Sequence, residues 1–169
     1  MKCCFTGHRV LSESEKLDIM KKLDRLIPAL AEKGCTEFNA GGALGFDTVA
    51  AIMVLRAKQK YPQMKLNMYL PYPQQAEKWN SADRRLYEKI KAESDNIFYS
   101  SSAYTPDCMN SRNRALVDNA DICIAWCRQI KGGTAYTISY AMDNGKEVFN
   151  LAMDGQEEAA AFINDISFE

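Results

Sequence analysis

Short apolar runs alternate with longer segments of helical period along this chain. The apolar runs are KCCFTG, EFNAGG, KLNMYLP, NIFYSS, DICIAWC and EVFNL, and the helical segments cover residues 13–33, 43–59, 81–94, 109–119, 134–143 and about 156–164. Six strands interleaved with helices predict an α/β fold with a doubly wound, mainly parallel sheet of about six strands. Because crossovers between parallel strands are right-handed, we expect helices on both faces of the sheet.

The first helical segment contains one conflicting signal. Ile19, Leu23 and Leu30 recur at helical spacing, and Gly34 follows where a helix commonly ends. Pro28 lies inside this stripe and predicts a kink or a break in the helix, because proline lacks the backbone N–H that the helix needs.

Size and charge narrow the function classes. The 169 residues, of which 47% are hydrophobic, suit a single domain over residues 1–169. Lys and Arg number 21 against 22 Asp and Glu, which argues against a nucleic-acid partner or an anionic membrane surface. No segment approaches the ~18 apolar residues of a spanning helix, and the N-terminus lacks the apolar core of a signal peptide. We expect a cytoplasmic protein with no membrane partner, and homo-oligomerisation is left open.

The cysteines are expected to be small buried hydrophobes. Cys3 and Cys4 are adjacent in an apolar run, where a strand would point them to opposite faces. The chain has no CxxC motif and His8 is its only histidine, so we expect no metal site.

Four polar or glycine-rich stretches follow predicted strands: TGHR (6–9), AGGALGFD (40–47), PYPQQAEKW (71–79) and GGT (132–134). In open parallel sheets the ligand crevice lies beyond the carboxyl ends of the strands, where the strand order reverses. The four stretches are therefore expected to meet in one crevice.

The stretch AGGALGFD matches neither a dinucleotide fingerprint nor a P-loop, because Gly41, Gly42 and Gly45 are followed by Phe46 and Asp47. A glycine turn that opens a helix still offers unpaired N–H groups to a phosphate. The alternative is a tight turn with nothing bound. Asp47 falls on an apolar helix and must be mostly buried, so it is expected to accept hydrogen bonds either from its own first helical turn or from the hydroxyls of a ribose.

The stretch MNSRNRALVDNA (109–120) places Arg112 and Asn113 on the apolar face of a helix. An arginine there needs a partner. Arg112 is expected to clamp a phosphate or carboxylate, or else to form a buried ion pair with an acid such as Asp118 or Asp121.

The other candidate ligand-binding residues carry weaker signals. Gly7 permits close approach and His8 and Arg9 offer donors; Gln75 and Trp79 suit a base, although a tryptophan at this place more often packs. The GGT stretch is a second glycine turn that opens a helix, with candidates Gly132, Gly133 and Thr134.

Taken together and in this order, the stretches CCFTGHR, GGALGFDTVAA, PYPQQAEKW, YTPDCMNSRN, VDNADICIAW and GGTAYTISYA closely resemble the YpsA-like proteins of the SLOG superfamily over about residues 2–150. That superfamily also includes the LOG phosphoribohydrolases and the DNA-processing protein DprA. The resemblance implies a Rossmann-like sheet and a pocket for nucleotide-derived molecules. It also implies phosphate-binding roles for the turn at Gly41–Gly45 and for the GGT turn, and a site role for Arg112 with Asn113.

Three functions remain open on these grounds. The leading expectation is a sensor or regulatory domain that binds a nucleotide-derived ligand such as ADP-ribose or NAD and requires no cofactor. The alternative is a hydrolase of the N-glycosidic bond in which Asp47 is the catalytic carboxylate; the positions where relatives carry glutamate are Ser139 and Ile52 here. Binding of single-stranded DNA in the manner of DprA ranks third, because the chain has no basic excess.

Overall fold

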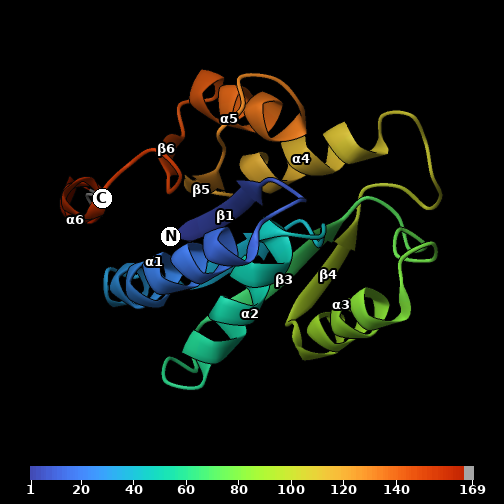
Figure 1. Ribbon diagram of the computed structural model, residues 1–169, viewed down its shortest axis with the longest axis horizontal. Coiled ribbons are helices and arrows are strands. Elements are labelled where there is room, and N and C mark those ends of the chain that lie inside the picture. The colour runs from blue at the N-terminus through green and yellow to red at the C-terminus, as the bar shows by residue number, and fades with distance from the viewer. Residues whose placement is uncertain (166–169) are drawn as a thin grey trace.

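The computed structural model describes residues 1–165 and shows strands and helices in strict alternation (Figure 1). Residues 166–169 of the expected single domain lie outside the described part. The strands are β1 (Lys2–Gly7), β2 (Glu37–Ala40), β3 (Lys65–Leu70), β4 (Asn96–Tyr99), β5 (Ile122–Trp126) and β6 (Glu147–Asn150). The helices are α1 (Glu13–Glu32), α2 (Phe46–Lys58), α3 (Ser81–Glu93), α4 (Cys108–Asp118), α5 (Gly133–Asp143) and α6 (Gln156–Asp165).

The six strands form one all-parallel sheet in the order β4-β3-β2-β1-β5-β6, which confirms the predicted α/β fold. The chain winds outward from β1 to β4, then returns across the sheet to β5 beside β1. The order therefore reverses between β1 and β5, and the carboxyl ends of these two strands define the switch point of the sheet.

Helices cover both faces, as the sequence predicted. Cys3 belongs to a large apolar cluster with residues of α1 and α2, whereas its neighbour Cys4 belongs to a smaller cluster with residues of α4 and α5. Because successive strand residues point to opposite faces, α1 and α2 lie on one face and α4 and α5 on the other. Figure 1 shows α4 and α5 separated from α1 and α2 by the sheet.

Of the kink or break predicted at Pro28, the break is wrong, because α1 runs without interruption through this residue. The helix begins with a capping box, in which Glu15 N–H donates to Ser12 Oγ and Ser12 N–H donates to the Glu15 carboxylate. It ends before Gly34, whose φ of 87° is the left-handed conformation expected of a C-cap. Tertiary packing of the buried stripe outweighs the one hydrogen bond that the proline removes.

All six cysteines are buried and unpaired, as expected of small hydrophobes. Burial raises the pKa of the Cys35 thiol to about 12, so this thiol stays protonated at neutral pH. None of the helices within residues 1–165 is long and apolar enough to cross a membrane.

Candidate functional site

The candidate site lies at the carboxyl ends of β1, β2 and β5. Gly7 is paired with Trp126 at the last register position of β1 and β5, and the chain continues from Gly7 into His8 and Arg9. The His8 N–H donates to the Trp126 carbonyl at 3.2 Å, which extends the pairing one residue past the strand. The stretch that includes His8 and Arg9 is thereby fixed at the switch point.

The glycine turn after β2 is pressed against this end of β1. Gly45, at a φ of 79°, lies so close that a Cβ there would come within 2.4 Å of the carbonyl oxygens of His8 and Arg9. The Phe46 N–H, the first of α2, donates to the His8 carbonyl at 3.0 Å, and a Cβ on Gly7 would meet the Phe46 side chain at 2.4 Å. Glycine is therefore required at Gly45 and Gly7 for the two segments to meet.

Arg112 of α4 contacts the same glycine turn. The guanidinium donates from Nη1 to the carbonyl of Gly41, and Nη1 lies 3.9 Å from Asp47 Oδ2. Asp47 Oδ2 also accepts the N–H of Ala43 at 3.3 Å. Arg112 and Asp47 are each only 5% exposed, so the turn is held by a buried ion pair.

The partner of Arg112 corrects one expectation from the sequence. We expected an acid such as Asp118 or Asp121 if Arg112 formed an ion pair. Asp118 instead accepts a hydrogen bond from Tyr140, and Asp121 accepts one from the backbone of Lys2. Asp47 replaces them because α4 brings Arg112 to the opening of α2, which a helix wheel of one segment cannot show.

Burial dominates the electrostatics of the pair. Desolvation raises the pKa of Asp47 above its ordinary value, although Arg112, the Ala43 N–H and Arg9 each act to lower it. Desolvation likewise lowers the pKa of Arg112, which Asp47 acts to raise. The positive charge of exposed Arg9 also acts to lower the pKa of both members of the pair.

Three other predicted residues support the turn or the core. Asn113 Oδ1 accepts from Arg112 Nε at 2.8 Å, and Gln75 Nε2 donates to the Gly42 carbonyl at 2.8 Å. Trp79 packs edge-on against Tyr87, with ring centroids 5.2 Å apart, as the packing alternative expected. The described contacts of Gln75 and Asn113 are structural contacts to the glycine turn and to Arg112.

Other predicted site residues lie on the surface at this end of the sheet. Arg9 Nη2 lies 3.8 Å from the sulfur of Met109 in the first turn of α4, so Arg9 reaches across the switch point. A Cβ on Gly132 or Gly133 would have no neighbour within 4 Å, which leaves the opening of α5 accessible. Thr134 follows in the first turn of α5 and is half-buried.

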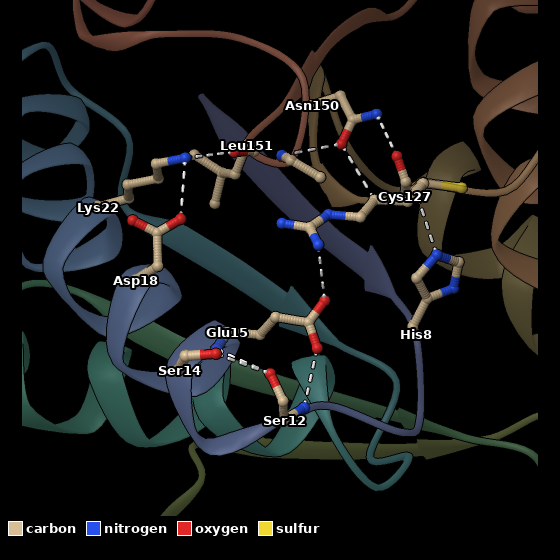
Figure 2. Close-up of polar contacts among 11 residues, drawn as sticks. His8, Ser12, Ser14, Glu15, Asp18, Lys22, Cys127, Asn150 and Leu151 are labelled. Carbon is tan, nitrogen blue, oxygen red and sulfur yellow. Dashed lines mark hydrogen bonds and ion pairs between the residues drawn. The ribbon is translucent and has the colours of Figure 1, made fainter.

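Sequence reasoning missed the contacts that anchor the loop after β5 (Figure 2). His8 Nε2 accepts the N–H of Arg128 at 2.9 Å, so the histidine links the two loops at the switch point. The Arg128 side chain lies 3.3 Å from Glu15 and over the ring of Trp126. Asn150 accepts from the Cys127 N–H and donates to the Cys127 carbonyl. Only the S-x-x-E pattern of Ser12 and Glu15 could have signalled part of this arrangement.

Comparison with known proteins places the chain in a family. The profile of YpsA, described as the YspA SLOG family, matches residues 4–154. The chain belongs to this family. A UPF0398 protein of Bacillus thuringiensis (strain Al Hakam) is 27% identical over 134 residues, which are 78% of this chain and 73% of the relative.

Two solved structures share the fold of this YpsA-family chain. DprA of Streptococcus pneumoniae superposes with a TM-score of 0.68 at 20% identity, covering 98% of this chain and 56% of that one. DprA of Helicobacter pylori, described by its single-stranded DNA binding mode, gives a TM-score of 0.65 at 18% identity and covers 97% of this chain and 79% of that one. The YpsA-family chain therefore spans little more than half of the Streptococcus chain, and the likeness shows the fold alone.

Two hollows of the YpsA-family structure lie against α1. One, of about 500 Å³, is bounded by α1, the end of β6 and α6, and the other, of about 560 Å³, by α1 and the end of α2. Neither is lined by a residue that the sequence predicted for the site. Within residues 1–165, no three His, Cys, Asp or Glu side chains gather to hold a metal ion.

Proposed function

We propose that this YpsA-family protein binds a phosphate-bearing, nucleotide-derived ligand of the ADP-ribose or NAD type at the switch-point crevice and acts as a sensor or regulator. The observation that carries the proposal is the glycine turn 41–45. Arg112 and Asp47 fix it from behind, and exposed Arg9 lies beside it. A preformed turn loses little conformational freedom when it binds an anion.

The charge at the crevice supports a phosphate-bearing ligand. Helix α2 begins at a glycine turn next to the switch point, α5 begins at glycines in the loop after β5, and α4 begins where Arg9 meets Met109. Each helix N-terminus carries about half a positive charge. Together with Arg9 these groups suit a diphosphate better than an uncharged sugar, because a diphosphate brings negative charge to them.

An aromatic pair beside the turn supports a ligand with a base. A Cβ on Gly42 would lie 2.4 Å from the side chain of Leu70, so the turn adjoins the end of β3. Tyr72 follows two residues later and packs edge-on against Tyr104, which is 67% exposed. An exposed tyrosine ring is a stacking surface for a nucleobase.

The position of Asp47 ranks hydrolysis of an N-glycosidic bond below binding. A carboxylate that stabilises a sugar cation or orients water must reach the substrate. Asp47 is 5% exposed and already engaged by Ala43 and Arg112. Its described contacts suit a group that shapes the turn.

Single-stranded nucleic acid is the second candidate ligand. The fold likeness to two DprA chains and the exposed ring of Tyr104 favour it. The balance of 21 basic against 22 acidic residues disfavours it, because nucleic-acid binding draws most of its affinity from phosphate contacts.

Thermal unfolding with ADP-ribose, NAD, AMP and cyclic nucleotides tests the proposal. A ligand at ~100 times its Kd stabilises the folded state by about 2.7 kcal/mol and raises the Tm by several degrees. No shift with any of these compounds would contradict it. Release of free base or nicotinamide on incubation, lost in Asp47→Asn, would favour the hydrolase, and oligonucleotide binding that weakens steeply with salt would favour DNA.

Arg9→Ala tests where the ligand binds. Loss of a charged hydrogen bond to phosphate should weaken binding about tenfold or more while the unfolding free energy stays near that of the wild type. Arg56→Ala is the matched control, because Arg56 is an exposed arginine at the opposite end of α2. Equal weakening by both substitutions would place the ligand elsewhere.

A further inference from the structure

Strand β4 forms an edge of the sheet and is unusually open for a strand of apolar residues. All four residues are exposed, with Ile97 at 39%, Phe98 at 47% and Tyr99 at 42%. Within residues 1–165 only β3 pairs with β4, so its outer side has no strand neighbour. Figure 1 shows β4 at the margin of the sheet, beyond β3.

Apart from its short length of four residues, this edge lacks the charged side chains that usually prevent strands from pairing. Residues 96–106 (NIFYSSSAYTP) hold no charged side chain in a chain that is 25% charged. The nearest acid, Asp95, is neutralised by Lys58 at 2.5 Å. Natural edges are normally protected by lysines, prolines, bulges or a covering segment. The opposite edge fits that rule, because β6 begins with Glu147 directly after Lys146, and its Phe149 is buried under α6.

The exposed side chains are arranged to meet copies of themselves. Phe98 packs against Tyr69 of β3, with ring centroids 4.9 Å apart, and so extends one face of the sheet to its margin. Ile97 and Tyr99 alternate onto the other face. A two-fold axis perpendicular to the sheet keeps each face continuous between two copies, and an uncharged strand then meets its own copy without repulsion.

We propose that a second copy of this chain docks on β4, with the two β4 strands antiparallel and Phe98 opposite Phe98 of the second copy. The two sheets then continue into one another, Phe98 and Tyr69 of both copies form an aromatic cluster on one face, and Ile97 packs against Tyr99 of the second copy on the other. A second copy is the occupant that matches this edge, because the antiparallel register sets Phe98 opposite Phe98 and Ile97 opposite Tyr99, so each exposed apolar side chain meets another and no charge meets a like charge. The glycine turn follows β2, two strands from β4, and sedimentation without ligand tests dimerisation apart from ligand binding.

Sedimentation equilibrium measures the assembly directly. The wild type should sediment at twice the 19.0 kDa of one chain, and Phe98→Lys should sediment as a monomer, because it places like charges opposite one another. Met142→Lys is the matched control, since Met142 is an apolar side chain on α5 that is 63% exposed, and it should stay dimeric. A monomeric wild type, or a dimer that persists in Phe98→Lys, would overturn the proposal.

Cross-linking tests the register and does not depend on loss of assembly. Under mild oxidation Phe98→Cys should give a reducible dimer, because directly opposite residues bring their Cβ atoms within disulfide reach. The six native cysteines are buried and give little background. Met142→Cys should stay uncross-linked. Cross-linking through residue 142 with none through residue 98 would overturn the proposal.

Discussion

The ion pair of Asp47 and Arg112 is the most informative contact at the scale of single residues. Two charges that are each 5% exposed carry a large desolvation cost, and removing one partner of such a pair typically costs about 3–5 kcal/mol. The pair bonds the carbonyl of Gly41 and the N–H of Ala43. The ion pair therefore stabilises the shape of the glycine turn, and in the proposed function it supports the ligand site without contacting the ligand.

The raised pKa of Asp47 predicts how stability changes with pH. The folded state holds this proton more tightly than the unfolded state, so the contribution of Asp47 to the unfolding free energy falls as pH rises through its folded pKa. From neutral pH down to about pH 4, near the ordinary value of 3.8, the wild type should therefore gain stability relative to Asp47→Asn. The gain is about 1.4 kcal/mol for each unit by which the folded pKa exceeds the unfolded one.

Urea unfolding of both proteins across this pH range measures the difference, and Asp47→Asn itself controls for every other titrating group. A difference that shrinks on acidification would mean that Arg112 and the backbone N–H groups outweigh burial and that the folded pKa is lowered.

Two glycines of the crevice are predicted to respond oppositely to a methyl group. Gly45→Ala forces a side chain into the left-handed region and within 2.4 Å of two backbone carbonyls, so it should destabilise the fold by more than about 2 kcal/mol. Gly133→Ala meets open space and should change stability by less than ~0.5 kcal/mol. Chemical denaturation of the pair checks this. Similar stabilities would mean that the turn relaxes away from the end of β1.

At the scale of elements, Pro28 is the feature that the helix tolerates at a cost. An interior proline costs about 3 kcal/mol in a helix, and its restriction of the unfolded chain returns about 0.4–1 kcal/mol. Pro28→Ala should therefore raise the unfolding free energy by roughly 2 kcal/mol, because the uninterrupted α1 gains a hydrogen bond. Pro62→Ala, in the exposed turn before β3, is the control and should lose a little stability. An unchanged Pro28→Ala would mean that α1 already adapts around the proline.

Elements were predictable from the sequence because periodicity is a local property. All twelve described helices and strands follow from the alternation of apolar runs and helical stripes, and the glycine turn and Arg112 follow from their positions at strand ends and on a helix face. The acid that pairs with Arg112 was not predictable, because it depends on where Arg112 of α4 lies relative to the start of α2. The link from His8 to Arg128 was missed for the same reason, since a histidine bonded to a backbone N–H leaves no pattern in the sequence.

At the scale of the whole molecule, the predicted site residues gather at the carboxyl end of the sheet, and the edge strand β4 exposes apolar side chains. The loops after β1, β2 and β5 leave the sheet at its carboxyl end, while β4 leaves apolar side chains at the margin two strands from β2. A ligand at the proposed site would bind loops that are already fixed, so its effect on stability would depend on ligand concentration. Pairing of β4 edges instead makes stability depend on protein concentration.

This difference yields the last prediction. If β4 edges pair, the Tm of the wild type without ligand should rise with protein concentration, because unfolding of a dimer releases two chains. Phe98→Lys should unfold at a Tm independent of concentration, and Met142→Lys should follow the wild type. Calorimetry over a hundredfold range of protein concentration measures this dependence of Tm on concentration. Such a range changes the free energy of dissociating the dimer by about 2.7 kcal/mol. Equal slopes in all three proteins would show that β4 takes no part, whereas a ligand-dependent shift with no slope would leave the crevice as the only site whose occupancy stabilises the fold.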